Sequence, residues 1–82
     1  RTVNDVNLYI EYKYSDDIEA IIRLVRDMRI NMNGLEITRI AGENDSHRYC
    51  AVLTVQTNKK KLDEELVKAI AKIDNVQSIE EL

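Results

Sequence analysis

The chain has 82 residues, of which 44% are apolar and 33% charged, and its formal net charge is −3. This length fits one domain and leaves no room for two. The 24 Ile, Leu and Val residues exclude a disordered chain, and the single Cys50 excludes a disulfide scaffold.

Several features that the sequence lacks restrict the class of protein and the compartment to which this domain can belong. No segment approaches the run of about 18 apolar residues that a membrane span requires, and no apolar region typical of a signal peptide is present. A lone cysteine is compatible with a reducing compartment. Because the sequence begins with Arg1 rather than Met, we expect residues 1–82 to be one domain excised from a longer protein.

The first predicted element is a strand over residues 6–14, where apolar and polar residues alternate. The side chains expected to face the core are Val6, Leu8, Ile10, Tyr12 and Tyr14. The side chains expected to face the other way are Asn7, Tyr9, Glu11 and Lys13.

A helix is predicted over 17–29, because the apolar period changes there from two residues to 3.6. Asp16 and Asp17 can accept hydrogen bonds from the unpaired N–H groups at the helix start, and Asp16 with Glu19 has capping-box spacing. The apolar stripe of this helix comprises Ile18, Ile21, Ile22, Val25 and Met28.

A second strand is predicted over 30–40, with a bulge or bend at Asn33-Gly34 and with Leu35 and Ile37 in the core. A polar turn over 41–47 then leads to a third strand over 48–57, and the two strands should pair as a hairpin. One side of the third strand holds Tyr49, Ala51, Leu53 and Val55, and the other holds Cys50, Val52, Thr54 and Gln56. Both sides are fairly apolar, which is typical of a central strand.

The last third of the chain begins with a short basic loop over 58–61. Helical spacing of Leu62, Leu66, Ala69, Ile70 and Ile73 then predicts a helix over 62–74. Asn75 suits the left-handed conformation that ends a helix, and residues 76–80 predict a fourth strand.

The order strand, helix, strand, strand, helix, strand predicts an α+β fold. Right-handed crossovers within each strand-helix-strand half favour the ferredoxin-like βαββαβ arrangement. That arrangement is a four-stranded antiparallel sheet with two helices on one face, and the first and third strands are central in it.

Groups that could carry catalysis are scarce. His47 lies in the turn before the third strand, and Cys50 on that strand would point away from it, so the pair lacks the hydrogen-bond reach of a nucleophile and its base. Zinc takes about four ligands, and only these two Cys or His residues exist. We therefore expect no enzyme activity and no catalytic or cofactor-binding residues.

Two acidic pairs could be taken for cation ligands. Asp16 and Asp17 stand at a helix start, where such residues are more often caps. Glu43 and Asp45 lack the further ligands and the fixed glycine of a calcium loop. We therefore expect no metal site.

Two basic clusters suggest an anionic partner such as lipid headgroups. The lysine cluster comprises Lys59, Lys60 and Lys61. The arginines Arg23, Arg26 and Arg29 recur along one side of the first predicted helix, and we favour a solvated face for them. We expect no nucleic-acid partner, because Tyr9 is a single ring where stacking modules present two or three.

The order of elements is similar to that of the ACT family of small regulatory domains. This resemblance implies amino-acid binding at the junction of the first strand and first helix, often in a dimer. ACT domains usually have a glycine just before that helix, whereas this junction reads Tyr14-Ser15-Asp16-Asp17-Ile18. The missing glycine argues against amino-acid binding, so we expect no small-molecule ligand.

The sequence resembles more closely the C-terminal, ACT-like soluble domain of the MgtC/SapB family of membrane proteins. The matching stretches lie at 29–39, 49–55 and 73–80, and they read RINM followed by LEITR, YCAVLTV, and IDNVQSIE. The resemblance implies a soluble domain on the cytoplasmic side of the inner membrane, attached to a helical membrane domain. It also implies an association with magnesium homeostasis, but it transfers no site residues.

The leading hypothesis is therefore a non-enzymatic cytosolic regulatory or interaction domain of an MgtC-like membrane protein. Its partner could be the membrane domain or another protein. The alternative is an amino-acid-binding ACT regulatory domain of a metabolic or nucleotide-signalling enzyme. An acylphosphatase-like enzyme is disfavoured, because Asp16 and Asp17 put negative charge where an anion would bind.

The sheet face without helices predicts self-association. On neighbouring strands, one semi-apolar patch can form from Tyr9, Cys50, Val52 and Thr54. Twofold dimers are the commonest homo-oligomers, so we expect a weak homodimer through this patch.

Overall fold

The computed structural model describes residues 4–41 and 47–82 and contains the predicted order of elements. The elements are β1 (Asn4–Tyr12), α1 (Asp17–Asp27), β2 (Asn31–Ala41), β3 (His47–Thr57), α2 (Lys60–Ala71) and β4 (Val76–Glu81). The predicted turn at 41–47 falls mostly outside the described residues, as do Glu43 and Asp45. Neither described helix is long and apolar enough to cross a membrane.

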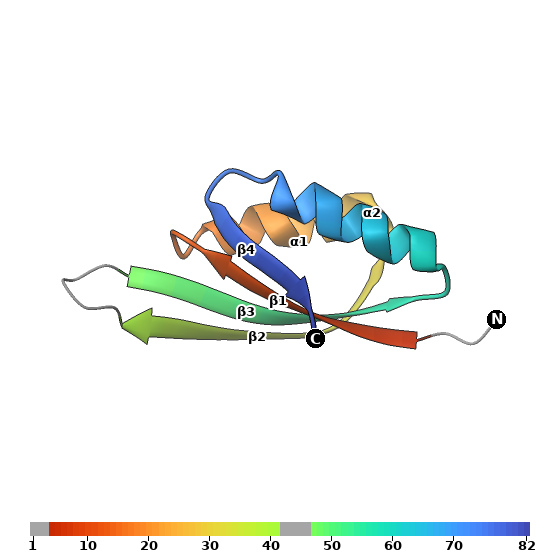
Figure 1. Cartoon of the computed structure of the whole chain (residues 1–82), viewed down its shortest axis with the longest axis horizontal. Helices are drawn as coiled ribbons and strands as arrows, with labels where there is room; N and C mark the ends of the chain where they lie inside the picture. The colour runs from red at the N-terminus through yellow and green to blue at the C-terminus, as the bar shows by residue number, and fades with distance from the viewer. Residues whose placement is uncertain (1–3, 42–46) are drawn as a thin grey trace.

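The four strands form one antiparallel sheet in the order β2-β3-β1-β4. The predicted ferredoxin-like fold, its central first and third strands and its hairpin of second and third strands are therefore confirmed. Both helices pack on the same face of the sheet (Figure 1). The other face, which no described helix covers, is called the open face below.

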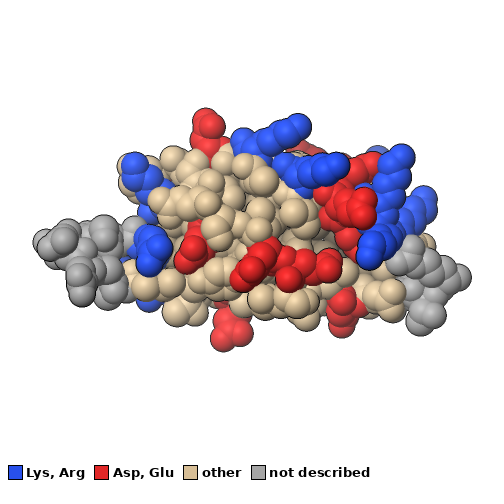
Figure 2. Space-filling model, viewed as in Figure 1, with Lys and Arg blue, Asp and Glu red and all other residues tan. Residues whose placement is uncertain are grey.

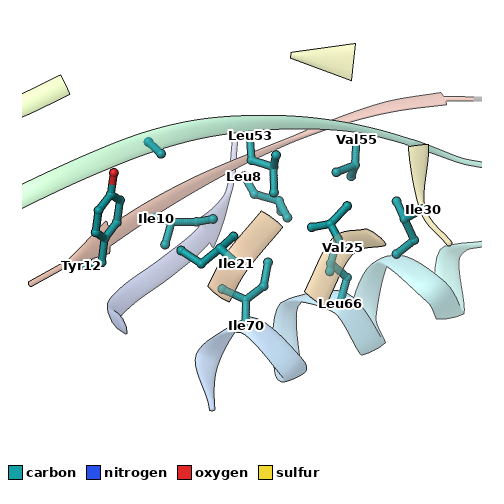
Figure 3. Packing of buried hydrophobic residues seen from close by; sticks show 11 residues of the cluster. Leu8, Ile10, Tyr12, Ile21, Val25, Ile30, Leu53, Val55, Leu66 and Ile70 are labelled. Atoms are coloured by element: carbon teal, nitrogen blue, oxygen red, sulfur yellow. The ribbon is translucent and has the colours of Figure 1, made fainter. Parts of the chain in front are cut away.

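Alternation along β1 and β3 builds the core. Leu8, Ile10 and Tyr12 of β1 are buried as predicted, and their register partners on β3 are Leu53, Ala51 and Tyr49. Figure 3 shows Leu8, Ile10 and Leu53 of the sheet facing apolar side chains of both helices. The helix residues buried at this contact are Ile21, Val25, Leu66 and Ile70.

The bulge predicted at Asn33-Gly34 is confirmed, because the register of β2 against β3 shifts between Met32 and Gly34. The left-handed conformation predicted for Asn75 is also confirmed, with φ of 73°. A second left-handed residue, Arg29 with φ of 58°, was not predicted. It stands between the end of α1 and β2.

Two residues predicted for the core are exposed instead. Tyr14 is 51% exposed, because β1 ends at Tyr12 and the chain turns before α1. Ile37 is 49% exposed, because β2 is an edge strand with a neighbour on one side only. Alternation determines the side of the sheet on which a residue lies, but it does not determine whether a helix covers that position.

The start of the second helix was also predicted wrongly. α2 begins at Lys60, so Lys60 and Lys61 belong to its first turn rather than to a loop. The backbone oxygen of Lys59 accepts a hydrogen bond from the Leu62 N–H at 3.1 Å. The buried Thr57 donates its hydroxyl hydrogen bond to the Asp63 carboxylate, which fixes this turn against the end of β3.

We expect the two isoleucines Ile10 and Ile37 to differ sharply when each is replaced by Ala. Ile10→Ala leaves a cavity in the core and should lower the free energy of unfolding by about 2–5 kcal/mol. Ile37→Ala removes a half-exposed side chain and should cost less than about 1 kcal/mol. Urea unfolding of both variants measures this, and equal losses would contradict the exposure of Ile37.

Candidate functional site

The open face brings together the predicted patch residues. Tyr9 is the register partner of Val52, while Asn7 is opposite Thr54 and Glu11 is opposite Cys50. Side chains at alternate positions of a strand share one face. Tyr9, Cys50, Val52 and Thr54, called the Tyr9 patch below, are therefore neighbours on β1 and β3, and all four are half-buried.

Hydrogen bonds fix the polar members of this face. The Tyr9 hydroxyl donates to Oε2 of Glu11 at 3.2 Å, and the Thr54 hydroxyl donates to Oδ1 of Asn7 at 2.7 Å. Desolvation of the hydroxyl raises the pKa of Tyr9 to about 12, and hydrogen bonding and charge at Cys50 and Glu11 add to the rise. Tyr9 is thus a neutral aromatic side chain at physiological pH.

Carboxylates flank the Tyr9 patch on both outer strands. Glu36 of β2 is the register partner of Val52, and Glu80 of β4 is the register partner of Tyr9. Both glutamates are exposed. Arg48, also exposed, lies further along β3 on the same face. The patch is therefore a semi-apolar strip between acidic borders, with a basic residue toward one end of its strands.

The junction of β1 and α1 is held by Asp17 rather than by the predicted cap Asp16. Asp16 occupies the cap position, but its side chain makes no capping hydrogen bond. Oδ2 of Asp17 accepts from the Tyr14 N–H at 2.7 Å, and its Oδ1 accepts from the Asn75 side-chain amide at 3.1 Å. The carboxylate of Asp17 thereby ties the turn before α1 to the turn before β4.

A hollow of about 810 Å³ lies at this junction. Its lining includes the cations Lys13 and Arg48, the anion Asp16, and the rings of Tyr14 and Tyr49. The Lys13 ammonium lies 5.2 Å from the centroid of the Tyr14 ring. The hollow therefore offers both signs of charge next to aromatic surface, which suits a small zwitterion.

A buried tyrosine lies behind the wall of this hollow. The Tyr12 ring stacks on the Tyr49 ring with centroids 5.7 Å apart and planes inclined by 13°. The Tyr12 hydroxyl is buried, and it has no hydrogen-bond partner among the described residues. Burial also raises the pKa of Tyr12. Sequence reasoning placed this ring in the core but carried no signal for its stacking or for the unpartnered hydroxyl.

The lysine cluster is separate from the Tyr9 patch and from the junction hollow. Lys59 precedes α2, Lys60 and Lys61 begin it, and all three are exposed. This end of α2 lies at the opposite end of the molecule from the β1–α1 junction (Figure 1). Figure 2 shows basic side chains toward both ends and along the top of the molecule, and acidic side chains across its middle.

The groups considered for catalysis or metal binding do not assemble in the described part of the chain. Cys50 lies on the open face, and the side chain of His47 is outside the described residues. Asp17 is engaged in the two hydrogen bonds given above. Within residues 4–41 and 47–82, no three His, Cys, Asp or Glu side chains gather closely enough to hold a metal ion.

No protein-family model and no curated protein sequence matches this chain. Its structure is similar to the ACT domain from GTP pyrophosphokinase of Chlorobium tepidum, with a TM-score of 0.80 and 12% identity over 99% of this chain and 100% of that one. It is similar to the small subunit of acetolactate synthase from Thermotoga maritima, with a TM-score of 0.70 and 15% identity over 95% of this chain and 47% of that one.

A third similar structure is the C-terminal domain of the MgtC protein from Mycobacterium tuberculosis. Its TM-score is 0.60 and its identity is 12% over 95% of this chain and 84% of that one. These TM-scores establish the ACT-like fold of the chain. At identities this low, the similarity concerns the fold alone.

The environment of Tyr9 predicts a loss of stability at high pH. The pKa of Tyr9 is about 12 in the folded chain against 10.0 for an unperturbed tyrosine, so this hydroxyl loses its proton at a lower pH in the unfolded chain than in the folded chain. The free energy of unfolding should therefore fall as the pH rises from 10 toward 12, and Tyr9→Phe should reduce that fall. Glu11→Gln should lower the pKa of Tyr9, measured by NMR titration of its ring. An unchanged pKa would contradict the contribution of Glu11.

Proposed function

We propose that this chain is a non-catalytic regulatory domain that acts by contact between its open face and another protein surface. The ACT-like fold supports the regulatory assignment. The observation that carries the proposal is the register pairing of Tyr9 with Val52 on a sheet face that no described helix covers. A flat aromatic ring next to a branched apolar side chain supplies contact area at a small cost in entropy.

The partner that we propose for this face is a second copy of the chain, giving a weak homodimer. The surface that a second copy would cover is the Tyr9 patch on the two central strands, and twofold dimers are the commonest homo-oligomers.

We further propose that the domain belongs to an MgtC-like membrane protein associated with magnesium homeostasis and lies on the cytoplasmic side of the inner membrane. The similarity to the MgtC C-terminal domain supports this, and the exposed lysine cluster suits a nearby anionic surface. The coding sequence ahead of residue 1 should then encode several membrane-spanning helices. Their absence would exclude the MgtC-like protein but would leave the open-face proposal intact.

The homodimer is tested by a charge placed in the Tyr9 patch. Val52→Lys should convert a concentration-dependent dimer into a monomer, because burying an unpaired ammonium is costly. Ala71→Lys adds the same charge at an exposed position of α2 and should leave the dimer unchanged. Sedimentation velocity at high micromolar concentration measures both variants. A wild-type chain that is strictly monomeric there would refute the dimer.

The junction hollow favours a second candidate, an ACT regulatory domain that binds an amino acid. Lys13 and Arg48 could receive the ligand carboxylate, and Asp16 could receive its ammonium group. In this candidate, the regulatory signal is a bound small molecule rather than contact with a protein surface. Its host would be a metabolic or nucleotide-signalling enzyme.

Thermal unfolding with each of the twenty amino acids decides between the two candidates. A ligand present at 100 times its dissociation constant adds about 2.7 kcal/mol to the free energy of unfolding. Arg48→Gln should abolish such a shift, while Arg23→Gln, at an exposed position of α1, should not. If no amino acid raises the melting temperature, the second candidate fails and the protein-contact proposal stands.

A further inference from the structure

β2 is an edge strand of the sheet, because only β3 lies beside it in the strand order β2-β3-β1-β4. Figure 1 shows it along the lower border of the sheet. Proteins usually protect such an edge with lysine, proline, a bulge or a short strand. β2 has 11 residues and contains no lysine or proline, and its bulge lies between Met32 and Gly34. The stretch from Gly34 to Ile40 is therefore a regular edge that lacks these protections.

The backbone groups of Leu35 and Ile37 point outward from this edge. Successive residues of a strand direct their N–H and C=O groups to opposite sides. Because the Asn7 oxygen accepts a hydrogen bond from the β4 side, the even-numbered residues of β1 face β3. Through the register, the odd-numbered residues of β3 face β1 and its even-numbered residues face β2. Glu36 is the partner of Val52, so Glu36 directs its backbone groups to β3, and Leu35 and Ile37 direct theirs away from the sheet.

The side chains beside those backbone groups are apolar and only partly covered. Leu35 and Ile37 are paired with buried residues of β3, so they lie on the helix-covered face of the sheet. Leu35 packs against the core and is half-buried. Ile37 is 49% exposed, and Met32, further along the same side of β2, is 39% exposed. A strand added about 4.8 Å from β2 would cover the exposed flank of Ile37 with its own side chains.

The charge on the opposite side of this edge favours a basic partner. Glu36 is exposed on the open face, and its register partner on β3 is the uncharged Val52. A residue placed opposite Glu36 on an added antiparallel strand forms a non-hydrogen-bonded pair with it, in which the side chains lie close together. A lysine there would meet the carboxylate, while apolar residues on either side of that lysine would lie next to Leu35 and Ile37.

A second β2 strand would not supply that lysine. The other open-face positions in the regular stretch of β2 are Gly34, Thr38 and Ile40, and none of them is charged. When the regular stretches of two β2 strands pair antiparallel through their outward backbone groups, Glu36 therefore meets one of these residues or the second Glu36. Charge complementarity favours a different occupant.

We propose that the outer edge of β2 binds an extended segment of a partner protein in which a lysine lies between two apolar residues. The segment joins the sheet as a strand antiparallel to β2. Its lysine lies opposite Glu36, and its apolar residues lie opposite Leu35 and Ile37 and exchange two backbone hydrogen bonds with each. This site is the edge of the sheet rather than its open face, so it does not depend on the proposed function.

The probe is the peptide acetyl-Thr-Val-Lys-Val-Thr-amide, titrated into the isotope-labelled chain and followed by amide NMR. The amide signals of Leu35 and Ile37 should shift and saturate. N-methylation of both valines removes the N–H groups that pair with β2, so that peptide should not bind. N-methylation of both threonines removes N–H groups that point away from β2, so that peptide should bind within about twofold of the parent. Equal affinities of the two methylated peptides would overturn strand addition.

Two variants of Ile37 test the same hydrogen bonds from the side of the chain. Ile37→Pro removes the outward N–H without removing a bond to β3, and proline is tolerated on edge strands. Ile37→Ala also shortens the side chain but keeps the N–H. Ile37→Pro should bind the parent peptide about tenfold more weakly than Ile37→Ala, and equal affinities would contradict the proposed pairing. Should Ile37→Pro not fold, the comparison of the two methylated peptides decides alone.

A charge reversal with a matched control tests the preference for lysine. Glu36→Lys should weaken binding of the parent peptide by about fivefold. The control, Glu80→Lys, makes the same change at an exposed position of β4 on the same open face and should bind within about twofold of wild type. Equal weakening in both variants would overturn the assignment of Glu36.

Dilution of the chain without peptide distinguishes a second copy from the proposed partner segment. The amide signals of Leu35 and Ile37 should stay unchanged as the chain concentration changes, because no second β2 strand pairs with this edge. A concentration-dependent shift of these two signals would show that a second β2 strand occupies the edge, and it would overturn the proposal.

Discussion

Nine consecutive register pairs join β1 to β3, from Asn4 with Thr57 to Tyr12 with Tyr49. This antiparallel pairing decides the environment of nearly every other part of the chain. It turns Leu8 and Ile10 toward the helices and turns Tyr9 and Glu11 toward the open face. A shift of one residue would exchange these two sets, so the apolar requirement of the core also determines which side chains remain available for contact.

The same pairing explains how much of the fold the sequence predicts. A period of two residues in β1 and β3 and a period of 3.6 in both helices are strong signals, because each element buries one side in a shared core. The left-handed Asn75 and the bulge beside Gly34 are local signals and also agree with the structure. Ile37 and Tyr14 differ because their exposure depends on where neighbouring elements end, and no local pattern contains that information.

The candidate sites also differ in whether the sequence pattern predicts them. The Tyr9 patch follows from alternation. The odd-numbered residues of β1 and the even-numbered residues of β3 lie on the same face of the sheet, and the register makes them neighbours. The junction hollow does not follow from it, since it depends on contacts between segments far apart in the sequence. Asp17 with Asn75, and Thr57 with Asp63, show this difference. Each side chain looks like an ordinary turn or helix-start residue until the fold supplies its partner.

Similar folds in a pyrophosphokinase, a synthase subunit and an MgtC domain show how widely this arrangement is reused. A shared fold does not transfer a function, and function has to be argued from the surfaces that the fold leaves exposed. In this chain those surfaces are the open face and the junction hollow. The open face exists because the β1–β3 pair contributes only one of its two faces to the core.

Native-state hydrogen exchange of the backbone amides at low micromolar concentration tests this pairing most directly. Amides of Val6, Leu8 and Ile10, which face β3, should exchange only through global unfolding, whereas the Asp5 amide should exchange fast. On the edge strand β2, the amides of Glu36 and Thr38 should be protected and that of Ile37 should not. Protection of Asp5 and Ile37 together with fast exchange at Val6 and Glu36 would mean that the two sides of each strand are reversed, and it would contradict the pairing.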